Sequence, residues 1–319
     1  MNRHIASYEG RGFKWKLAAA LGAVYILWGS TYFAIRVAVS TIPPLLAAGV
    51  RFVIAGLLLY GWSRLRGKEP PQRSQWLSLW LMGLLMFLVC YGLLFWAEKT
   101  VPSGVTSVLV AMIPAWMLIL EVMILKTQRL SKTVVAALMI GLAGVAILTG
   151  ALDSAGRHIP WLPFVAILLS GISWSLGSVV SKKMNLPVAQ GINAGGQMMC
   201  GGCLLLLCSG LFGEWHGLRP VPQNAIFSMI YLIVAGSLIA YSAYVWLLRW
   251  VPSSKASSYA YVNPVVALGV GYFMGGEALH ASAVVGAVLA LISVFIILTH
   301  RTSVPVETRR ENYTDKSGS

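Results

Sequence analysis

Long apolar runs constrain this chain more than any other feature of its sequence. Runs of about 18 to 24 residues recur between Leu17 and Thr299, and about 20 apolar residues in a helix cross the ~30 Å hydrocarbon core of a bilayer. Charged residues make up only 11% of the chain, and the mean hydropathy is +0.75, outside the usage of soluble domains. The runs lack the alternation of barrel strands, so they predict membrane-spanning helices.

We therefore predict an all-α integral membrane protein with ten transmembrane helices and no soluble domain. Residues 1–16 are polar and basic, and the full-length apolar run after them favours a retained first helix over a cleaved signal peptide. Residues 151–160 form an outer loop, and residues 301–319 form a disordered C-terminal tail. The predicted spans are 17–39, 45–62, 76–96, 101–125, 133–150, 161–180, 191–212, 225–248, 252–275 and 281–299.

The net charge of +14 indicates membrane topology. With the N-terminus placed in the cytoplasm, most of the 24 lysines and arginines lie in the tails and loops on that side. The opposite side holds only Lys99, Arg157 and Arg219, while Arg36 and Arg51 lie within spans. This asymmetry follows the positive-inside rule. It predicts that both termini are cytoplasmic, and it argues against a nucleic-acid partner.

The sequence repeats itself. Two repeats of five helices, 17–150 and 161–300, follow from the matches, and because five is odd the second must be inverted in the membrane. Inverted repeats are frequent in secondary transporters, where the substrate site lies between them near the midplane. At an offset of 150, Val101, Pro102, Ser103, Ser107 and Pro114 meet identical residues, as do Tyr91 with Tyr241; at an offset of 146, Trp28 meets Trp174 and Gly49 meets Gly195.

Four segments have a recognisable order and spacing: WGSTYFAIR at 28–36, GVRF at 49–52, SYAYVNPVVA at 258–267 and GGEAL at 275–279. Together with the two repeats of five helices, they make the chain resemble the EamA-type exporters of the drug/metabolite transporter superfamily. The resemblance implies a bacterial inner-membrane exporter of small organic metabolites, often amino acids or drug-like compounds. One departure is visible, because the first half has Lys126, Thr127 and Gln128 where Gly276 and Glu277 would be matched.

Two prolines at matched depth are candidate hinges. Pro114 and Pro264 each lie twelve residues after the proline that opens their span, about 18 Å along a helix axis. An interior proline removes a backbone hydrogen bond, so both spans are expected to kink near the midplane and to gate a central cavity. The alternative is that membrane helices tolerate proline and that duplication copied the pair.

Polar residues around the second proline are candidate substrate ligands. Tyr259 and Asn263 are four residues apart and share a helix face, and Ser257 precedes them. An asparagine facing lipid would be costly, so we expect this face to line the cavity. Interhelical packing through polar side chains is the alternative.

Aromatic and cationic residues complete the predicted substrate site. Trp28 and Tyr32 form a stripe that ends at Arg36, and the sixth helix carries a similar stripe of Trp174, Ser178 and Lys182. Arg51 is expected to line a water-filled cavity and to bind an anionic group, whereas Arg36 is expected to reach the lipid headgroups. The predicted substrate-binding residues are Trp28, Tyr32, Arg51, Tyr91, Trp174, Tyr241, Ser257, Tyr259 and Asn263.

The sequence offers little for other functions. All five histidines lie in tails, loops or interfaces, and the four cysteines lie within spans without an accompanying metal-ligand set. No Walker A motif is present. We expect no catalytic residue, no metal and no cofactor, and we expect a small-molecule substrate, a lipid bilayer around the protein and a monomer or homodimer. A membrane-embedded enzyme and a non-transporting receptor or assembly factor are the alternatives.

Overall fold

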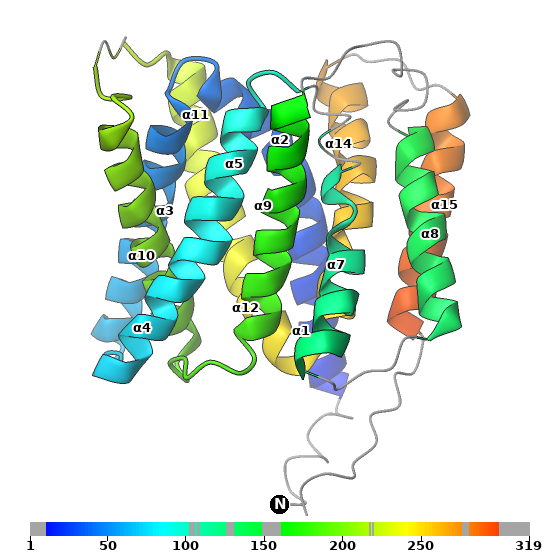
Figure 1. Cartoon of the computed structure of the whole chain (residues 1–319), viewed down its shortest axis with the longest axis horizontal. Coiled ribbons are helices and arrows are strands. Elements are labelled where there is room, and N and C mark those ends of the chain that lie inside the picture. The colour runs from blue at the N-terminus through cyan, green and yellow to red at the C-terminus, as the bar shows by residue number, and fades with distance from the viewer. Residues whose placement is uncertain are drawn as a thin grey trace, which may run out of the picture.

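The computed structural model describes residues 11–101, 106, 109–125, 131–148, 161–216, 218, 220–275 and 281–299. Every regular element within these ranges is a helix, and the helices run side by side along one common direction (Figure 1). The prediction of an all-helical protein is therefore confirmed for this part of the chain. The predicted outer loop 151–160 and C-terminal tail 301–319 lie outside the described residues.

Several helices contain a short π-helical segment, labelled η, within an otherwise α-helical rod. Segments η3 and η6 fall at the same place in the two repeats, since their residues overlap at the offset of 150. The first half comprises α1 Arg11–Ala23, η2 Val24–Trp28, α2 Gly29–Val39, α3 Pro44–Leu65, α4 Arg73–Met82, η3 Gly83–Val89, α5 Cys90–Ala97, α7 Ile113–Leu120, η4 Glu121–Leu125 and α8 Lys132–Leu148. The second half comprises α9 Trp161–Val180, α10 Gln190–Leu211, α11 Gln223–Tyr231, η6 Leu232–Tyr241, α12 Ser242–Trp250, α13 Ser253–Ala256, α14 Tyr259–Gly275 and α15 Ala281–Thr299.

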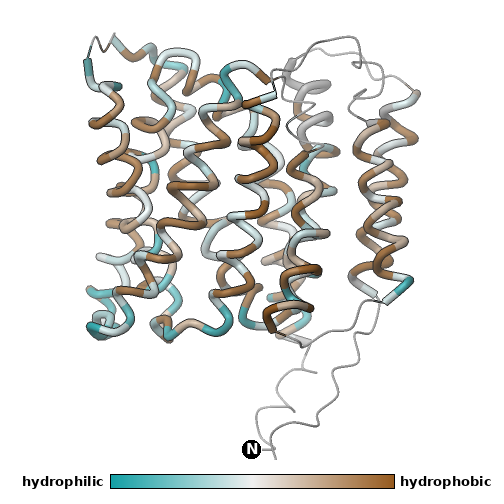
Figure 2. Tube along the Cα trace, viewed as in Figure 1, coloured by the Kyte–Doolittle hydropathy of each residue, from teal (hydrophilic) through white to brown (hydrophobic). Residues whose placement is uncertain are grey.

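The helices have the length and polarity of a membrane protein. Within the described ranges, six rods are long and apolar enough to cross a bilayer: Gly12–Val39, Pro44–Leu65, Arg73–Ala97, Trp161–Val180, Gln190–Leu211 and Gln223–Trp250. Shorter apolar helices cover Ile113–Leu125, Lys132–Ile147 and Val284–Ile297. Apolar residues dominate the middle of the rods, and polar residues gather at their ends (Figure 2). The number ten remains a prediction.

The ends of the second and seventh predicted spans have the same local chemistry. Gly67 follows α3 with a φ of 73°, and Gly213 follows α10 with a φ of 74°. Glycine adopts this left-handed conformation without steric cost and is the usual residue after a helix end. The two glycines are 146 residues apart, so the repeat extends to the helix termini.

Glycines also let counterpart helices approach closely. Helix α3 packs along α10, and a Cβ atom added to Gly56 would lie 2.7 Å from the backbone nitrogen of Met199 and 2.8 Å from the carbonyl oxygen of Gly195. Small residues at such crossings are typical of helix packing in membranes. In the same way α8 packs along α15, where a Cβ atom on Gly144 would lie 2.8 Å from the Gly286 carbonyl oxygen.

The helices form a main bundle and a flanking pair. Helix α2 lies against α11 and α14, and its counterpart α9 lies against α5 and α7. Helices α8 and α15 lie at one side of the bundle (Figure 1), packed mainly on each other and on α14. A separate hydrophobic cluster joins this pair to α7 and α14.

The two prolines do not bend their helices in the same way. Pro114 lies in the first turn of α7, after a turn at residues 111–112, where a missing backbone N–H costs nothing. Pro264 lies inside α14, and the interruption in that span is at residues 257–258. The prediction that both prolines lie inside a continuous helix is therefore wrong for Pro114, which begins a helix segment.

Candidate functional site

A small central cavity of about 60 Å³ lies between helices of the two halves. Of the predicted substrate-binding residues, Trp28, Tyr32, Tyr91, Trp174, Tyr259 and Asn263 all line it, so residues up to 235 positions apart come together. The remaining lining residues are Thr31, Ile35, Cys90, Leu94, Val110, Ile113 and Ser170.

An aromatic cluster forms one wall of the central cavity. The Trp28 ring lies 4.7 Å from the Tyr259 ring, 5.1 Å from the Tyr244 ring and 5.5 Å from the Trp174 ring, between centroids. The indole N–H of Trp28 donates to the carbonyl oxygen of Gly236 at 3.0 Å, which fixes the ring. Edge-to-face contacts of this kind favour an ordered wall.

Asn263 presents an open hydrogen-bonding group to the cavity. Its side chain is only 2% exposed, and its Oδ1 atom has no hydrogen-bond partner among the described residues. A buried amide oxygen without a partner costs about 1–3 kcal/mol. Such a group is well placed to accept a hydrogen bond from a solute.

Tyr32 connects the central cavity to a larger pocket, which we call the outer pocket because the predicted topology places it on the outer face. This pocket has a volume of about 1010 Å³ and is lined by Arg36, Glu98, Lys99, Glu214 and His216 among others. Arg36 was expected at the lipid headgroups, but it lies in the wall of this pocket. The lining of the outer pocket therefore has charges of both signs.

Two carboxylates of the outer pocket differ in their roles. Glu214 accepts hydrogen bonds from the Leu46 backbone N–H at 2.9 Å and from the Ser209 hydroxyl at 2.9 Å, so it ties a loop to the start of α3. Glu98 follows directly after α5, and burial raises the pKa of its carboxyl to about 8. Burial thus brings the titration of the Glu98 carboxyl close to neutral pH.

Arg51 is fully buried, with 1% of its surface exposed. Its Nε donates to the Ser237 hydroxyl at 2.9 Å, and its guanidinium lies 4.8 Å from the Phe52 ring centroid and 5.7 Å from that of Tyr91. Its Nη1 has no partner among the described residues. Arg51 does not line the central cavity or either pocket, so it adjoins the cavity behind Tyr91.

A second pocket, of about 730 Å³, opens at the other end of the bundle, and we call it the inner pocket. Three of its lining residues are joined by hydrogen bonds. The Tyr241 hydroxyl donates to Gln197 Oε1 at 2.6 Å, and Gln197 Nε2 donates to Asn193 Oδ1 at 2.7 Å. Gln197 is the counterpart of Arg51 at the offset of 146. The Tyr241 ring also contacts Trp174, with centroids 6.3 Å apart, so the aromatic cluster separates this pocket from the central cavity.

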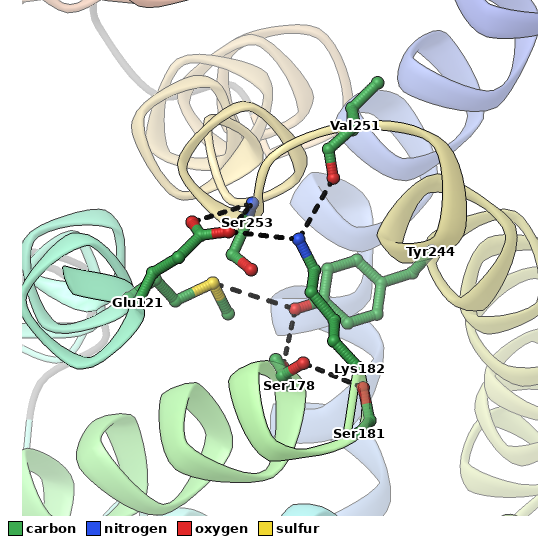
Figure 3. Close-up of polar contacts among 8 residues, drawn as sticks. Glu121, Ser178, Ser181, Lys182, Tyr244, Val251 and Ser253 are labelled. Carbon is green, nitrogen blue, oxygen red and sulfur yellow. Dashed lines mark hydrogen bonds and ion pairs between the residues drawn. The ribbon is translucent and has the colours of Figure 1, made fainter. Parts of the chain in front are cut away.

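An ion pair crosses the wall of the inner pocket (Figure 3). The Lys182 ammonium lies 3.2 Å from Glu121 Oε1 and donates to the Val251 carbonyl oxygen at 3.2 Å. Glu121 Oε2 accepts a hydrogen bond from the Ser253 backbone N–H at 3.1 Å. Burial lowers the pKa of Lys182, and the Glu121 charge acts in the opposite direction. We call these residues the inner latch, because Glu121 comes from the first half and the others from the second.

The remaining sequence predictions are placed as follows. Ser257 is buried in the turn between α13 and α14, and it does not line the central cavity or either pocket. The inner latch was missed, although the stripe from Trp174 to Lys182 pointed to this helix face. Ser178 of that stripe shares a hydrogen bond of 2.7 Å with the Tyr244 hydroxyl.

Comparison with known proteins gives a consistent set of relatives. Residues 14–150 and 161–299 each match the profile of the EamA-like transporter family. The uncharacterized inner membrane transporter YedA of Escherichia coli K12 is 42% identical over 267 residues, covering 82% of this chain and 84% of that protein. The uncharacterized transporter YvbV of Bacillus subtilis 168 is 27% identical over 292 residues, with coverages of 90% and 92%. The protein PecM of Dickeya dadantii 3937 is 28% identical over 278 residues, with coverages of 85% and 88%.

One solved crystal structure shares the fold. It matches with a TM-score of 0.73 at 19% identity, over 88% of this chain and 95% of that chain. The likeness concerns the arrangement of the helices alone.

Proposed function

The chain belongs to the EamA-like transporter family, and from this premise we propose that it exports small organic metabolites, amino-acid-like or drug-like, from the cytoplasm by alternating access. Its relatives YedA and YvbV are named transporters, and the name of YedA together with the apolar helices of this chain supports a multi-pass inner membrane protein. We further propose ten spans in two inverted repeats, with both termini in the cytoplasm.

The central cavity is the observation that carries this proposal. It lies where α2, α5, α9 and α14 meet, so both halves contribute to it. Through Tyr32 it adjoins the outer pocket, while the aromatic cluster and the inner latch lie on the side of the inner pocket. A site between repeats that is closed toward one pocket and adjacent to the other fits one state of an alternating-access cycle.

We assign substrate contact to the residues that line the cavity and were also predicted from the sequence, with Asn263 as the hydrogen-bond acceptor. Its free Oδ1 suits an N–H or O–H of the solute, and the aromatic rings around it suit a planar or apolar body. Pro264, one residue beyond Asn263, is proposed to let α14 bend when the halves rock, and the break before Pro114 is proposed to do the same for α7.

Flux and accessibility together test the proposal. Purified protein in sealed vesicles should move members of an amino-acid and drug-like panel down their gradients, and empty vesicles should not. Single cysteines at Tyr259 and Asn263, in a background without the native cysteines, should react with a water-soluble maleimide at rates that substrate changes. Cysteines at Val262 and Val265, which pack in the cluster of the flanking pair, should react slowly. Equal labelling at all four positions, with no effect of substrate, would refute the cavity assignment.

A further inference from the structure

The inner latch has the geometry of a carboxylate-binding site that is occupied by the protein's own carboxylate. Glu121 is 2% exposed, and its two oxygens face the Lys182 ammonium and the Ser253 backbone N–H. Both Glu121 and Lys182 line the inner pocket. A solute in that pocket therefore reaches the Lys182 ammonium directly, and it reaches the Ser253 amide, which follows the lining residue Pro252, when Glu121 moves aside.

The charges around the inner pocket favour an anion. Its lining residues in the described part of the chain include Lys182, Lys183 and Arg249, against the single carboxylate of Glu121. The outer pocket is balanced by comparison, since its two carboxylates face Arg36 and Lys99. An anionic solute is thus attracted more strongly at the inner end than at the outer end of the path.

Arg51 adds a second, independent observation. It is buried, its Nη1 has no hydrogen-bond partner, and the Lys182–Glu121 pair is the only ion pair found among the described residues. No protein carboxylate in that part of the chain therefore balances the Arg51 charge. An anion that moves from the inner pocket, whose lining is net positive, toward the central cavity would approach a second positive charge, that of Arg51 next to Tyr91.

We infer that the inner pocket takes solutes that carry a carboxylate or an anion of similar size, and that this anion replaces Glu121 on Lys182 and the Ser253 amide. The inference rests on the proposed export function and names its substrate class. The exchange keeps constant the number of charge-assisted hydrogen bonds that Lys182 and the Ser253 amide donate, so no bare ammonium is left in a partly buried site. The displaced Glu121 carboxylate must then turn into the inner pocket, which it already lines, to be solvated. An uncharged solute cannot make this exchange, and the latch then stays closed.

Chemical rescue tests the exchange with acetate as the probe. Glu121→Ala empties the carboxylate position, and the thermal unfolding midpoint of the full chain in detergent is followed as acetate is added at constant ionic strength. Acetate should raise the midpoint in a saturable way, whereas acetamide, its uncharged analogue, should not. Adding Lys182→Gln should increase the acetate concentration needed about tenfold or more, the effect of losing one charge-assisted hydrogen bond.

Controls separate recognition from general stability. Lys132→Gln, in the Glu121→Ala background, removes an exposed cation at the start of α8 and should leave the acetate response unchanged. If Glu121→Ala does not yield folded protein, Glu121→Gln frees Lys182 with less loss of packing and should show the same preference for acetate over acetamide. Equal responses to acetate and acetamide, or an acetate response that survives Lys182→Gln, would mean that Glu121 is only a structural tie.

Vesicle flux distinguishes this inference from the proposed function. N-acetylphenylalanine should move faster than its uncharged amide, and Lys182→Gln should remove the difference. Protein-dependent flux confined to uncharged solutes would keep the transport function and overturn the anion inference. If no solute of the wider panel moves, the proposed function fails, while the acetate response still reports on the anion site.

Discussion

Replacing Arg51 by glutamine, the residue at its counterpart position Gln197, should separate a functional charge from a structural one. The Arg51 side chain is buried between helices α3 and η6 and makes one hydrogen bond, to Ser237. Its guanidinium also lies against the rings of Phe52 and Tyr91 and close to Gly236. The cost of burying a charge with so few partners offsets much of what these contacts contribute to the fold.

The cost of burying the Arg51 charge and the contributions of its contacts nearly cancel. Burying an ion in a protein costs several kcal/mol even after relaxation. A hydrogen bond from a charged donor contributes about 1.5–3 kcal/mol, and each of the two ring contacts contributes about 0.5–2 kcal/mol. The guanidinium therefore stabilises the fold little, and Arg51→Gln should change the free energy of unfolding by no more than about 2 kcal/mol. Transport of anionic solutes should nevertheless fall about tenfold or more, the loss expected for one charge-assisted contact.

The assay measures thermal unfolding and vesicle flux on the same preparations. Arg66→Gln is the matched control, because Arg66 is an exposed cation directly after the same helix and stacks on Trp62 with its guanidinium 4.5 Å from the ring centroid. The control should keep both stability and selectivity. A large loss of stability in Arg51→Gln, with an unchanged ratio of anionic to uncharged flux, would refute the functional role of the charge.

Three further outcomes follow from the fold. Alkaline phosphatase fused after Thr299 should be inactive, because the distribution of basic residues predicts that this end lies in the cytoplasm; high activity would overturn the predicted topology. Gly56→Ala should destabilise the protein by about 1–3 kcal/mol, since its Cβ would meet the backbone of α10. Gly61→Ala, in the same helix, is the control and should not destabilise, because its Cβ would meet nothing within 4 Å. Equal effects of the two variants in thermal melts would contradict the close packing. Because the pKa of Glu98 is raised from 4.5 to about 8 by burial, the folded protein binds this proton more tightly than the unfolded chain. The free energy of unfolding should therefore fall as pH rises from about 5 to about 8, and Glu98→Gln should reduce this fall; an unaltered pH profile in the variant would count against the burial of this carboxyl.

The sequence predicts the residues of the central cavity well because the repeat restricts where they can lie. Trp28 and Trp174 are counterparts at the offset of 146, and an interface between inverted repeats brings counterparts together. Asn263 was identified from the cost of exposing an amide to lipid. Duplication constrains the two tryptophans, and the cost of desolvation constrains Asn263. Neither constraint depends on how the helices are rotated.

The predictions that depend on helix rotation or local backbone geometry were less successful. Whether Arg51 or Arg36 faces water depends on how α2 and α3 turn within the bundle, and residue type alone does not fix that rotation. The pairing of Glu121 with Lys182 joins two halves whose relative register the sequence leaves open. Pro114 was expected inside a continuous helix, but the chain makes a turn just before it, since proline fits the first turn of a helix better than its interior.

The two ends of the molecule are built from matching helices but differ in their charged residues. Lys182 of the inner latch is the counterpart of Arg36, which lines the outer pocket, so both ends carry a cation at the matched position. Glu121 has no acidic counterpart, because the residue at the offset of 150 is Gly271. An ion pair can therefore close the inner end but has no matched equivalent at the outer end. Two repeats of matched architecture alone would make the two closed states similar in energy, whereas one unmatched carboxylate favours closure at the inner end. On the proposed mechanism, an anionic solute that takes the place of Glu121 removes this bias only while it is bound, which couples opening toward the cytoplasm to the presence of a solute to export.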